Sequence, residues 1–255
     1  MDKLLIEGQQ SLTGSVKISG AKNSVLPMLC ASVMVSDGEV ELENIPHLQD
    51  VTTTTRLLTQ MGVSVTMDEL MHISLDSSAI HTLYAPYELV KTMRSSILVL
   101  GPLLARFGEA KVSLPGGCAI GMRPVDMHLS ALEQMGATIS VEGGYISAKA
   151  NRLKGANLVF PRKSVTGTEN IIMAATLAEG KTVIENCACE PEITDLCDFL
   201  IKMGAKISGQ GTSKIIVEGV NKLKGTTHKP LPDRIEAGTF MVAAAITKGD
   251  VEIRN

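Results

Sequence analysis

The sequence has no tryptophan and only 3% aromatic residues among its 255 positions, so aliphatic and methionine side chains have to fill its interior. This lack also argues against a protein that binds single-stranded nucleic acid, because such proteins stack bases on aromatic rings. The net charge of -3 gives no excess of one sign that would indicate nucleic acid or a membrane surface as a partner. No apolar run reaches the roughly 18 residues of a membrane-spanning helix, and the first eight residues lack a secretion-signal pattern.

The five cysteines, an odd number, form no disulfide framework, which is typical of a protein in a reducing cytoplasm. Cys187, Cys189 and Cys197 are the closest group, but their spacing is not that of a zinc site. No histidine stands at metal or catalytic-triad spacing, and all five are interpreted as ordinary surface or core residues: His47, His72, His81, His128 and His228. We therefore expect a cytoplasmic protein without a metal, a cofactor, a nucleic-acid partner or a membrane partner.

The chain repeats itself at intervals of roughly 70 residues. Strand-like phrases that each follow a helical run recur at 38–44 (GEVELEN), 180–186 (GKTVIEN) and 249–255 (GDVEIRN), with 108–114 (GEAKVSL) as a looser fourth. Met-Gly pairs at 61–62, 135–136 and 203–204 predict helices that end on a glycine. The phrase NRLKG at 151–155 is echoed as NKLKG at 221–225.

These repeats predict units that each read helix, strand, helix, strand, strand. The units are expected at about 22–93, 94–160 and 162–230. A fourth unit starts near residue 232 and contains one helix and one strand by residue 255. We therefore expect a fragment, or a chain that a partner segment completes.

A cation stands at the start of the first helix of each unit: Lys22, Arg94, Lys163 and, in the fourth, Arg234. A cation at the positive end of a helix is locally unfavourable unless an anion binds there. If the units pack about a pseudo-threefold axis, these helix starts can face one common space. The alternative is that these residues are solvated surface cations.

Residues 114–126 (LPGGCAIGMRPVD) predict a glycine-rich loop with Cys118 at its centre. A thiol in such a loop, with Arg123 five residues on, is suited to nucleophilic or acid chemistry, although a buried packing cysteine is the alternative. Pro124 favours a helix start, and Asp126 would lie in its first turn, either complementing the helix dipole or accepting hydrogen bonds from a ligand.

The polar residues 163–168 (KSVTGT) predict a second loop that enters a helix and offers backbone amides to a phosphate or a base edge. Asn23, beside Lys22, is either a ligand contact or a helix N-cap.

Four motifs together resemble the UDP-N-acetylglucosamine 1-carboxyvinyltransferase family of enolpyruvyl transferases: 20–23 (GAKN), 115–129 (PGGCAIGMRPVDMHL), 163–170 (KSVTGTEN) and 232–239 (PDRIEAGT). The related shikimate-phosphate branch is not known for this cysteine loop, so Cys118 favours the UDP-sugar branch. The resemblance implies an α/β (α+β) fold: an inside-out α/β barrel of three repeated units with pseudo-threefold symmetry. It also implies that residues 21–230 form one complete domain, while 1–20 and 231–255 belong to a second, similar domain.

By the same resemblance, the reaction transfers the enolpyruvyl group of phosphoenolpyruvate to the 3'-hydroxyl of UDP-N-acetylglucosamine and releases phosphate, which opens peptidoglycan precursor synthesis. Cys118 would be the general acid and the target of fosfomycin-type epoxides, and Lys22 and Asn23 would contact phosphoenolpyruvate. The residues implied to hold the UDP-sugar are Arg94, Arg123, Pro124, Val125, Asp126, Met127, Lys163, Ser164, Val165, Thr166 and Gly167.

In this family the second domain supplies an aspartate and arginines that lie beyond these 255 residues, so we expect the chain alone to be weakly active or inactive. Two alternatives stay open. One is a non-catalytic fragment that binds a UDP-sugar or phosphate, and the other is an enolpyruvyl transferase that acts on shikimate phosphate.

Overall fold

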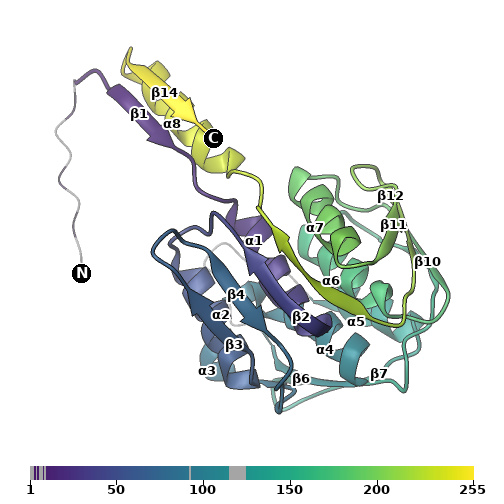
Figure 1. The fold of residues 1–255 in the computed structure, drawn as a ribbon. Helices are drawn as coiled ribbons and strands as arrows, with labels where there is room; N and C mark the ends of the chain where they lie inside the picture. Colours follow the sequence, from purple (N-terminus) through teal and green to yellow (C-terminus); the bar gives the residue numbers. More distant parts are fainter. Residues whose placement is uncertain (1–2, 4, 6–7, 9, 92, 115–124) are drawn as a thin grey trace.

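The structure, a computed structural model, describes residues 3, 5, 8, 10–91, 93–114 and 125–255, with only the backbone at position 94. A large body carries a smaller projection, which consists of β1 (Thr13–Lys17), α8 (Arg234–Ile246) and β14 (Asp250–Arg254) (Figure 1). Within the projection, β1 and β14 pair in parallel although more than 230 residues separate them in the sequence. Two stretches of chain join the projection to the body, one leading into α1 (Lys22–Ala31) and one leaving β13 (Leu223–His228).

The body consists of three successive units. The first contains α1, η1 (Ser32–Met34), β2 (Val35–Leu42), α2 (Gln49–Met61), β3 (Ser64–Met67), β4 (Ile73–Asp76), β5 (Tyr84–Ala85) and α3 (Tyr87–Val90). The second contains η2 (Arg94–Val99), α4 (Leu100–Phe107), β6 (Glu109–Ser113), α5 (Asp126–Gln134), β7 (Thr138–Glu142), β8 (Tyr145–Lys149) and β9 (Asn157–Val159). The third contains α6 (Val165–Thr176), β10 (Lys181–Glu185), α7 (Pro191–Lys202), β11 (Lys206–Ser208), β12 (Lys214–Glu218) and β13.

Each unit has one strand more than the sequence pattern predicts, and this last strand pairs with a strand of another unit. β5 pairs in parallel with β6 of the second unit, β9 with β10 of the third, and β13 returns to β2 of the first. The three four-stranded sheets therefore share one order: β13-β2-β4-β3, β5-β6-β8-β7 and β9-β10-β12-β11. The parallel strand at one edge of each sheet links neighbouring units, and β13 links the third unit back to the first.

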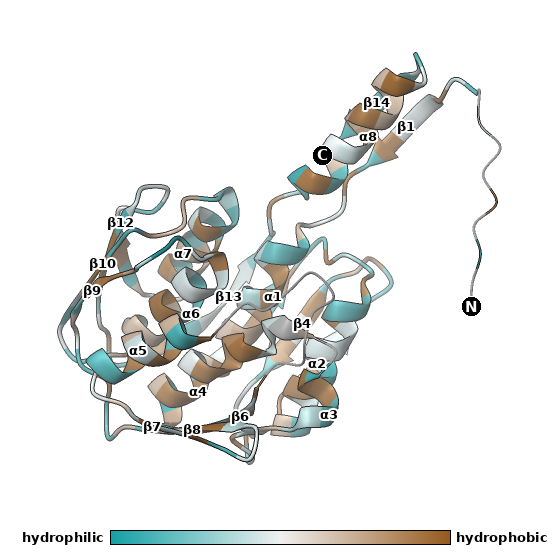
Figure 2. Cartoon of the chain, turned by 180° about the vertical axis from the view of Figure 1, so that it is seen from behind, coloured by the Kyte–Doolittle hydropathy of each residue, from teal (hydrophilic) through white to brown (hydrophobic). Residues whose placement is uncertain are grey.

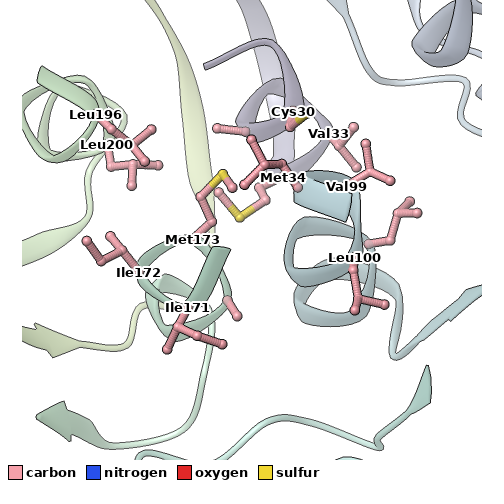
Figure 3. Close-up of a cluster of buried hydrophobic side chains, with 14 of the residues drawn as sticks. Cys30, Val33, Met34, Val99, Leu100, Ile171, Ile172, Met173, Leu196 and Leu200 are labelled. Atoms are coloured by element: carbon pink, nitrogen blue, oxygen red, sulfur yellow. The ribbon is translucent and has the colours of Figure 1, made fainter. Parts of the chain in front are cut away.

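The core lies between the sheets, where α6 packs against both α4 and α1. In α1 every residue from Ser24 to Ala31 is buried, as expected of a helix that is apolar on all sides and surrounded by protein. Side chains from four separate segments meet in one cluster, shown in Figure 3, in which Met34 and Met173 lie among leucine, isoleucine and valine. Methionine is suited to such gaps because its side chain is flexible, and this core compensates for the shortage of aromatic residues.

α4 and α6 approach so closely that only glycine fits at position 101. A Cβ atom there would lie 2.3 Å from Oδ1 of Asn170 and 2.6 Å from its backbone oxygen. That Oδ1 accepts a hydrogen bond from the Gly101 amide (2.8 Å), while Nδ2 donates to the Ile97 carbonyl (3.1 Å) and lies 2.9 Å from Nδ1 of His128. Asn170 thus joins three helical segments inside the core.

The predicted helix ends are confirmed. Gly62, Gly136 and Gly204 all have the left-handed backbone that ends a helix, with φ of 106°, 93° and 106°. The repeated strand phrases are also confirmed as β2, β6, β10 and β14.

Candidate functional site

A pocket of about 600 Å³ lies where the projection meets the body. It is lined by Ser19, Lys22, Asn23, Leu48, Gln49, Asp50, Asp233, Ile235, Glu236 and Thr239. Three helices begin here, since Lys22 and Gln49 are the first residues of α1 and α2, and Ile235 lies in the first turn of α8. Helix starts carry partial positive charge and unpaired backbone N–H groups, which suit an anionic ligand, whereas the carboxylates of Asp50, Asp233 and Glu236 in the same lining oppose one.

Lys22 is the cation of this pocket. Its Nζ lies 3.2 Å from Oδ2 of Asp50, and its backbone N–H donates to Oδ2 of Asp233 at 3.4 Å. The Lys22 and Asp50 side chains keep 40% and 36% of their surface exposed, so a ligand can reach both. The N-cap of α1 is Ala21, and Asn23 is the second helical residue, so the N-cap interpretation of Asn23 is wrong.

Acidic side chains hold the start of α8 against the body. Asp233 caps α8 by accepting from the amides of Ile235 (2.8 Å) and Glu236 (3.1 Å). Glu236 accepts from the amide (3.1 Å) and the hydroxyl (2.7 Å) of Ser19. The guanidinium of Arg234 donates two hydrogen bonds to the buried Glu192, at 3.0 and 3.3 Å. These contacts fix the side of the pocket that the projection provides.

A second cluster forms where α5 and α6 begin. Asp126 is the first residue of α5, and its Oδ1 accepts from Nη2 of Arg162 at 2.9 Å. Ser164 caps α6 by accepting from the Gly167 amide at 3.1 Å. A Cβ at Gly167 would lie 3.6 Å from Cε of Met127, so the two predicted UDP-sugar segments are side by side.

The structure places the predicted site residues in three groups. Lys22 and Asn23 line the pocket. The described residues of the UDP-sugar set lie at helix starts outside that pocket: Arg94 begins η2, Val125 precedes α5, Asp126 and Met127 open it, Lys163 precedes the cap Ser164, and Val165, Thr166 and Gly167 form the first turn of α6. Cys118, Arg123 and Pro124 lie outside the described residues. Their roles stay predictions.

Asp50 and Glu236 are pocket residues that the sequence analysis missed. An acidic residue in the first turn of a helix is the ordinary complement to the helix dipole, so neither residue carried a signal of its own. Asp233 and Glu236 both lay within the quoted motif at 232–239, but their hydrogen bonds to Lys22 and Ser19 depend on contacts across the fold.

Three of the described cysteines, Cys30, Cys187 and Cys197, are buried and unsuited to chemistry. Burial raises the pKa of Cys187 to about 11 and that of Cys197 to about 12, and it raises the pKa of the buried Cys30 as well, so these thiols stay protonated. Within the described ranges, no group of three histidine, cysteine or acidic residues is arranged to hold a metal ion. Among the helices that the structure describes, none combines the length and apolar character needed to cross a bilayer.

Comparison with known proteins identifies the class to which this chain belongs. The model of the EPSP synthase (3-phosphoshikimate 1-carboxyvinyltransferase) family matches residues 6–255, and the chain belongs to this family. It is 59% identical over 256 residues to the UDP-N-acetylglucosamine 1-carboxyvinyltransferases of Coxiella burnetii strains Dugway 5J108-111 and RSA 493 / Nine Mile phase I. These matches cover 100% of this chain and 59% of the length of each relative. The resemblance predicted from the four motifs is thus confirmed.

Two solved structures share the mixed α/β fold. The enolpyruvyl transferase NikO from Streptomyces tendae superimposes with a TM-score of 0.78 at 22% identity, covering 92% of this chain and 56% of that chain. An EPSP synthase from Acinetobacter baumannii gives a TM-score of 0.75 at 23% identity, covering 96% and 56%. At this level of identity the likeness concerns the fold alone.

Proposed function

We propose that the protein to which this chain belongs transfers the enolpyruvyl group of phosphoenolpyruvate to the 3'-hydroxyl of UDP-N-acetylglucosamine and releases inorganic phosphate. The observation that carries this proposal is the 600 Å³ pocket at three helix starts, with Lys22 exposed inside it. Both substrates are strongly anionic, and an accessible cation beside helix N-termini is suited to them. The 59% identity to relatives named for this activity supports the same substrate pair.

In the proposed reaction the sugar hydroxyl adds to C2 of phosphoenolpyruvate while a proton is delivered to C3, giving a tetrahedral intermediate. The proton of the sugar hydroxyl passes to the aspartate expected in the second domain, and loss of phosphate from C2 together with a proton from C3 then restores the double bond. We assign the proton delivery to Cys118, the contact with phosphoenolpyruvate to Lys22 and Asn23, and the UDP-sugar to the segments 123–127 and 163–167 with Arg94. The packing of Met127 beside Gly167 supports a shared role for these two segments.

We further propose that the three units form an inside-out barrel about a pseudo-threefold axis and that residues 21–230 are one domain. The common strand order of the three sheets and the return of β13 to β2 support this arrangement. Residues 1–20 and 231–255 would then belong to a second domain that further polypeptide completes. Helix α8 supports this proposal, because it carries hydrophobic residues (Figure 2) and because Ile235, Val242 and Ile246 are 55%, 66% and 80% exposed.

The proposed reaction belongs to the first committed step of peptidoglycan precursor synthesis in the cytoplasm, and an epoxide of the fosfomycin type would inhibit it by alkylating Cys118. Because the chain spans only 59% of its relatives' length, we propose that these 255 residues alone turn over slowly or not at all.

The experiment is an assay of phosphate release by the complete protein with phosphoenolpyruvate and each acceptor in turn. We expect release with UDP-N-acetylglucosamine, none with shikimate 3-phosphate, and loss of release in Cys118→Ser and in protein treated with fosfomycin. Release with shikimate 3-phosphate alone would assign the other acceptor. Binding of UDP-N-acetylglucosamine without release, unaffected by Cys118→Ser, would identify a binding protein and contradict the proposal.

A further inference from the structure

A second cavity, of about 440 Å³, lies at the opposite end of the central helices from Lys22. It is lined by Met34, Ser36, Ala105, Arg106, Asn151, Arg152, Leu177, Asn221 and Lys222. Met34 follows α1, Arg106 closes α4 and Leu177 follows α6, so all three units contribute to it. The ten residues of α1 alone span about 15 Å, which separates this cavity from the pocket described above.

The cavity brings together the two copies of a repeated phrase, NRLKG at 151–155 and NKLKG at 221–225, to which the proposed function assigns no role. The pairs Asn151-Arg152 and Asn221-Lys222 occupy the same place in NRLKG and NKLKG. Residues 151–160 and 221–230 also have the same order of exposed, intermediate and buried positions. Two units therefore present an amide followed by a cation to one space.

The two arginines of the cavity, Arg106 and Arg152, use only part of their N–H donors in hydrogen bonds within the protein. Nη1 of Arg106 donates to the carbonyls of Val33 (2.8 Å) and Ser77 (3.0 Å). Nε of Arg152 donates to the Leu177 carbonyl (3.3 Å), and its Nη2 donates to Oδ1 of Asn221 (3.2 Å). Within the part of the chain that the structure describes, Nε and Nη2 of Arg106 and Nη1 of Arg152 have no acceptor.

The positive charge of the cavity is not balanced by a carboxylate, although the Arg106 guanidinium lies 4.7 Å from the centre of the Phe107 ring. No carboxylate lines it, and none of its three cations forms an ion pair with any described residue. Burial lowers the pKa of the half-buried Arg106 guanidinium, because no anion offsets the loss of solvent around it. The negative ends of the nearby helices offset about half a charge each and leave the cavity positive.

We propose that this cavity binds a small oxyanion with two or more negative charges, of the phosphate-ester or polycarboxylate class. The two guanidinium groups, fixed by backbone carbonyls, offer N–H donors to its oxygens, and Lys222 and the Asn221 amide nitrogen complete the shell. The volume is within the range of small-molecule sites. The site is independent of the proposed transfer reaction.

The test is calorimetric titration of the full chain, carrying Lys22→Ala so that the first pocket lacks its cation. Inorganic pyrophosphate and citrate serve as separate probes at constant ionic strength. We expect saturable binding of at least one probe. Which probe binds more tightly tells whether the site prefers phosphate or carboxylate ligands. We also expect Lys222→Gln and Arg152→Gln to lower the affinity by about tenfold or more.

Lys206→Gln is the matched control, since it removes an exposed lysine of the third unit outside the cavity, and it should leave the affinity unchanged. Lys222 is exposed and holds no described contact, so Lys222→Gln tests the site without risk to folding. The proposal is overturned if neither probe binds saturably, or if Lys206→Gln weakens binding as much as Lys222→Gln.

Discussion

The ammonium group of Lys22 lies 3.2 Å from a carboxylate oxygen of Asp50, which comes from a different helix of the same unit. The Asp50 carboxylate thus occupies the ammonium group of Lys22, which is the cation that we propose contacts phosphoenolpyruvate. More than a third of each side chain is exposed, and such pairs contribute only about 0.2–1 kcal/mol. A substrate anion can therefore displace Asp50 at little cost in free energy.

The substitution Asp50→Asn should strengthen phosphoenolpyruvate binding to the complete protein by roughly 2- to 5-fold, because the competing carboxylate is gone. Isothermal titration measures the change. Glu109→Gln is the control, since it breaks another exposed lysine pair, that with Lys149, and should leave affinity unchanged. Weaker binding in Asp50→Asn would show instead that Asp50 contacts the substrate.

Gly101→Ala should lower the free energy of unfolding by about 2–3 kcal/mol, because the new methyl group would overlap Asn170 in the contact between α4 and α6. Gly238→Ala, also within a helix, has nothing within 4 Å of its new Cβ and should be neutral or stabilising by up to about 1 kcal/mol. Urea denaturation of both variants makes the comparison. Equal effects would show that the close approach of the two helices is not what requires glycine.

Asp195→Ala should destabilise the protein by about 2–4 kcal/mol, because two partners lose a buried acceptor. These are Nε2 of His228, at 2.8 Å, and the backbone N–H of Leu231, at 3.0 Å. Since residues 228–231 lead from β13 to α8, the backbone N–H of Leu231 should also exchange its hydrogen faster in this variant, because its acceptor is gone. Asp198→Ala, an exposed change on α7, should alter neither stability nor the hydrogen exchange of Leu231, and an equal response would refute the assignment.

The stability of the protein should depend on pH through Glu169, whose pKa rises from 4.5 to about 8 because the carboxyl is buried and because Glu192 and Glu190 are near. Between these values the folded protein keeps a proton that the unfolded chain has released. The free energy of unfolding therefore falls as pH rises from about 4.5 to about 8.

Glu169→Gln should remove this part of the pH dependence. The fall in melting temperature between pH 5 and pH 8 should therefore be smaller in the variant than in the protein with Glu169, by about 2–4 °C for each kcal/mol of free energy of unfolding. Thermal denaturation at both pH values measures it, with the exposed Glu179→Gln as the control that keeps the original slope. A slope unchanged in Glu169→Gln would contradict the assignment.

The sequence alone determined the features that depend on local patterns. The glycine ends of α2, α5 and α7, the strands β2, β6, β10 and β14, and the period of roughly 70 residues follow from backbone preference and alternation over a few neighbouring positions. The same motifs were specific enough to identify the family and to bring Lys22 and Asn23 into the candidate site.

Only the tertiary structure decided which distant segments meet. β5 and β9 pair with strands of the following unit, and β13 pairs with a strand of the first. No local pattern specifies which strand edge another strand will join. The same holds for charged side chains that meet across the fold. The sequence does not show that Lys22 pairs with Asp50, or that one cavity is lined by Arg106, Arg152 and Lys222. The physical reason is that the energy of such groups depends on their neighbours in space, which sequence spacing does not give.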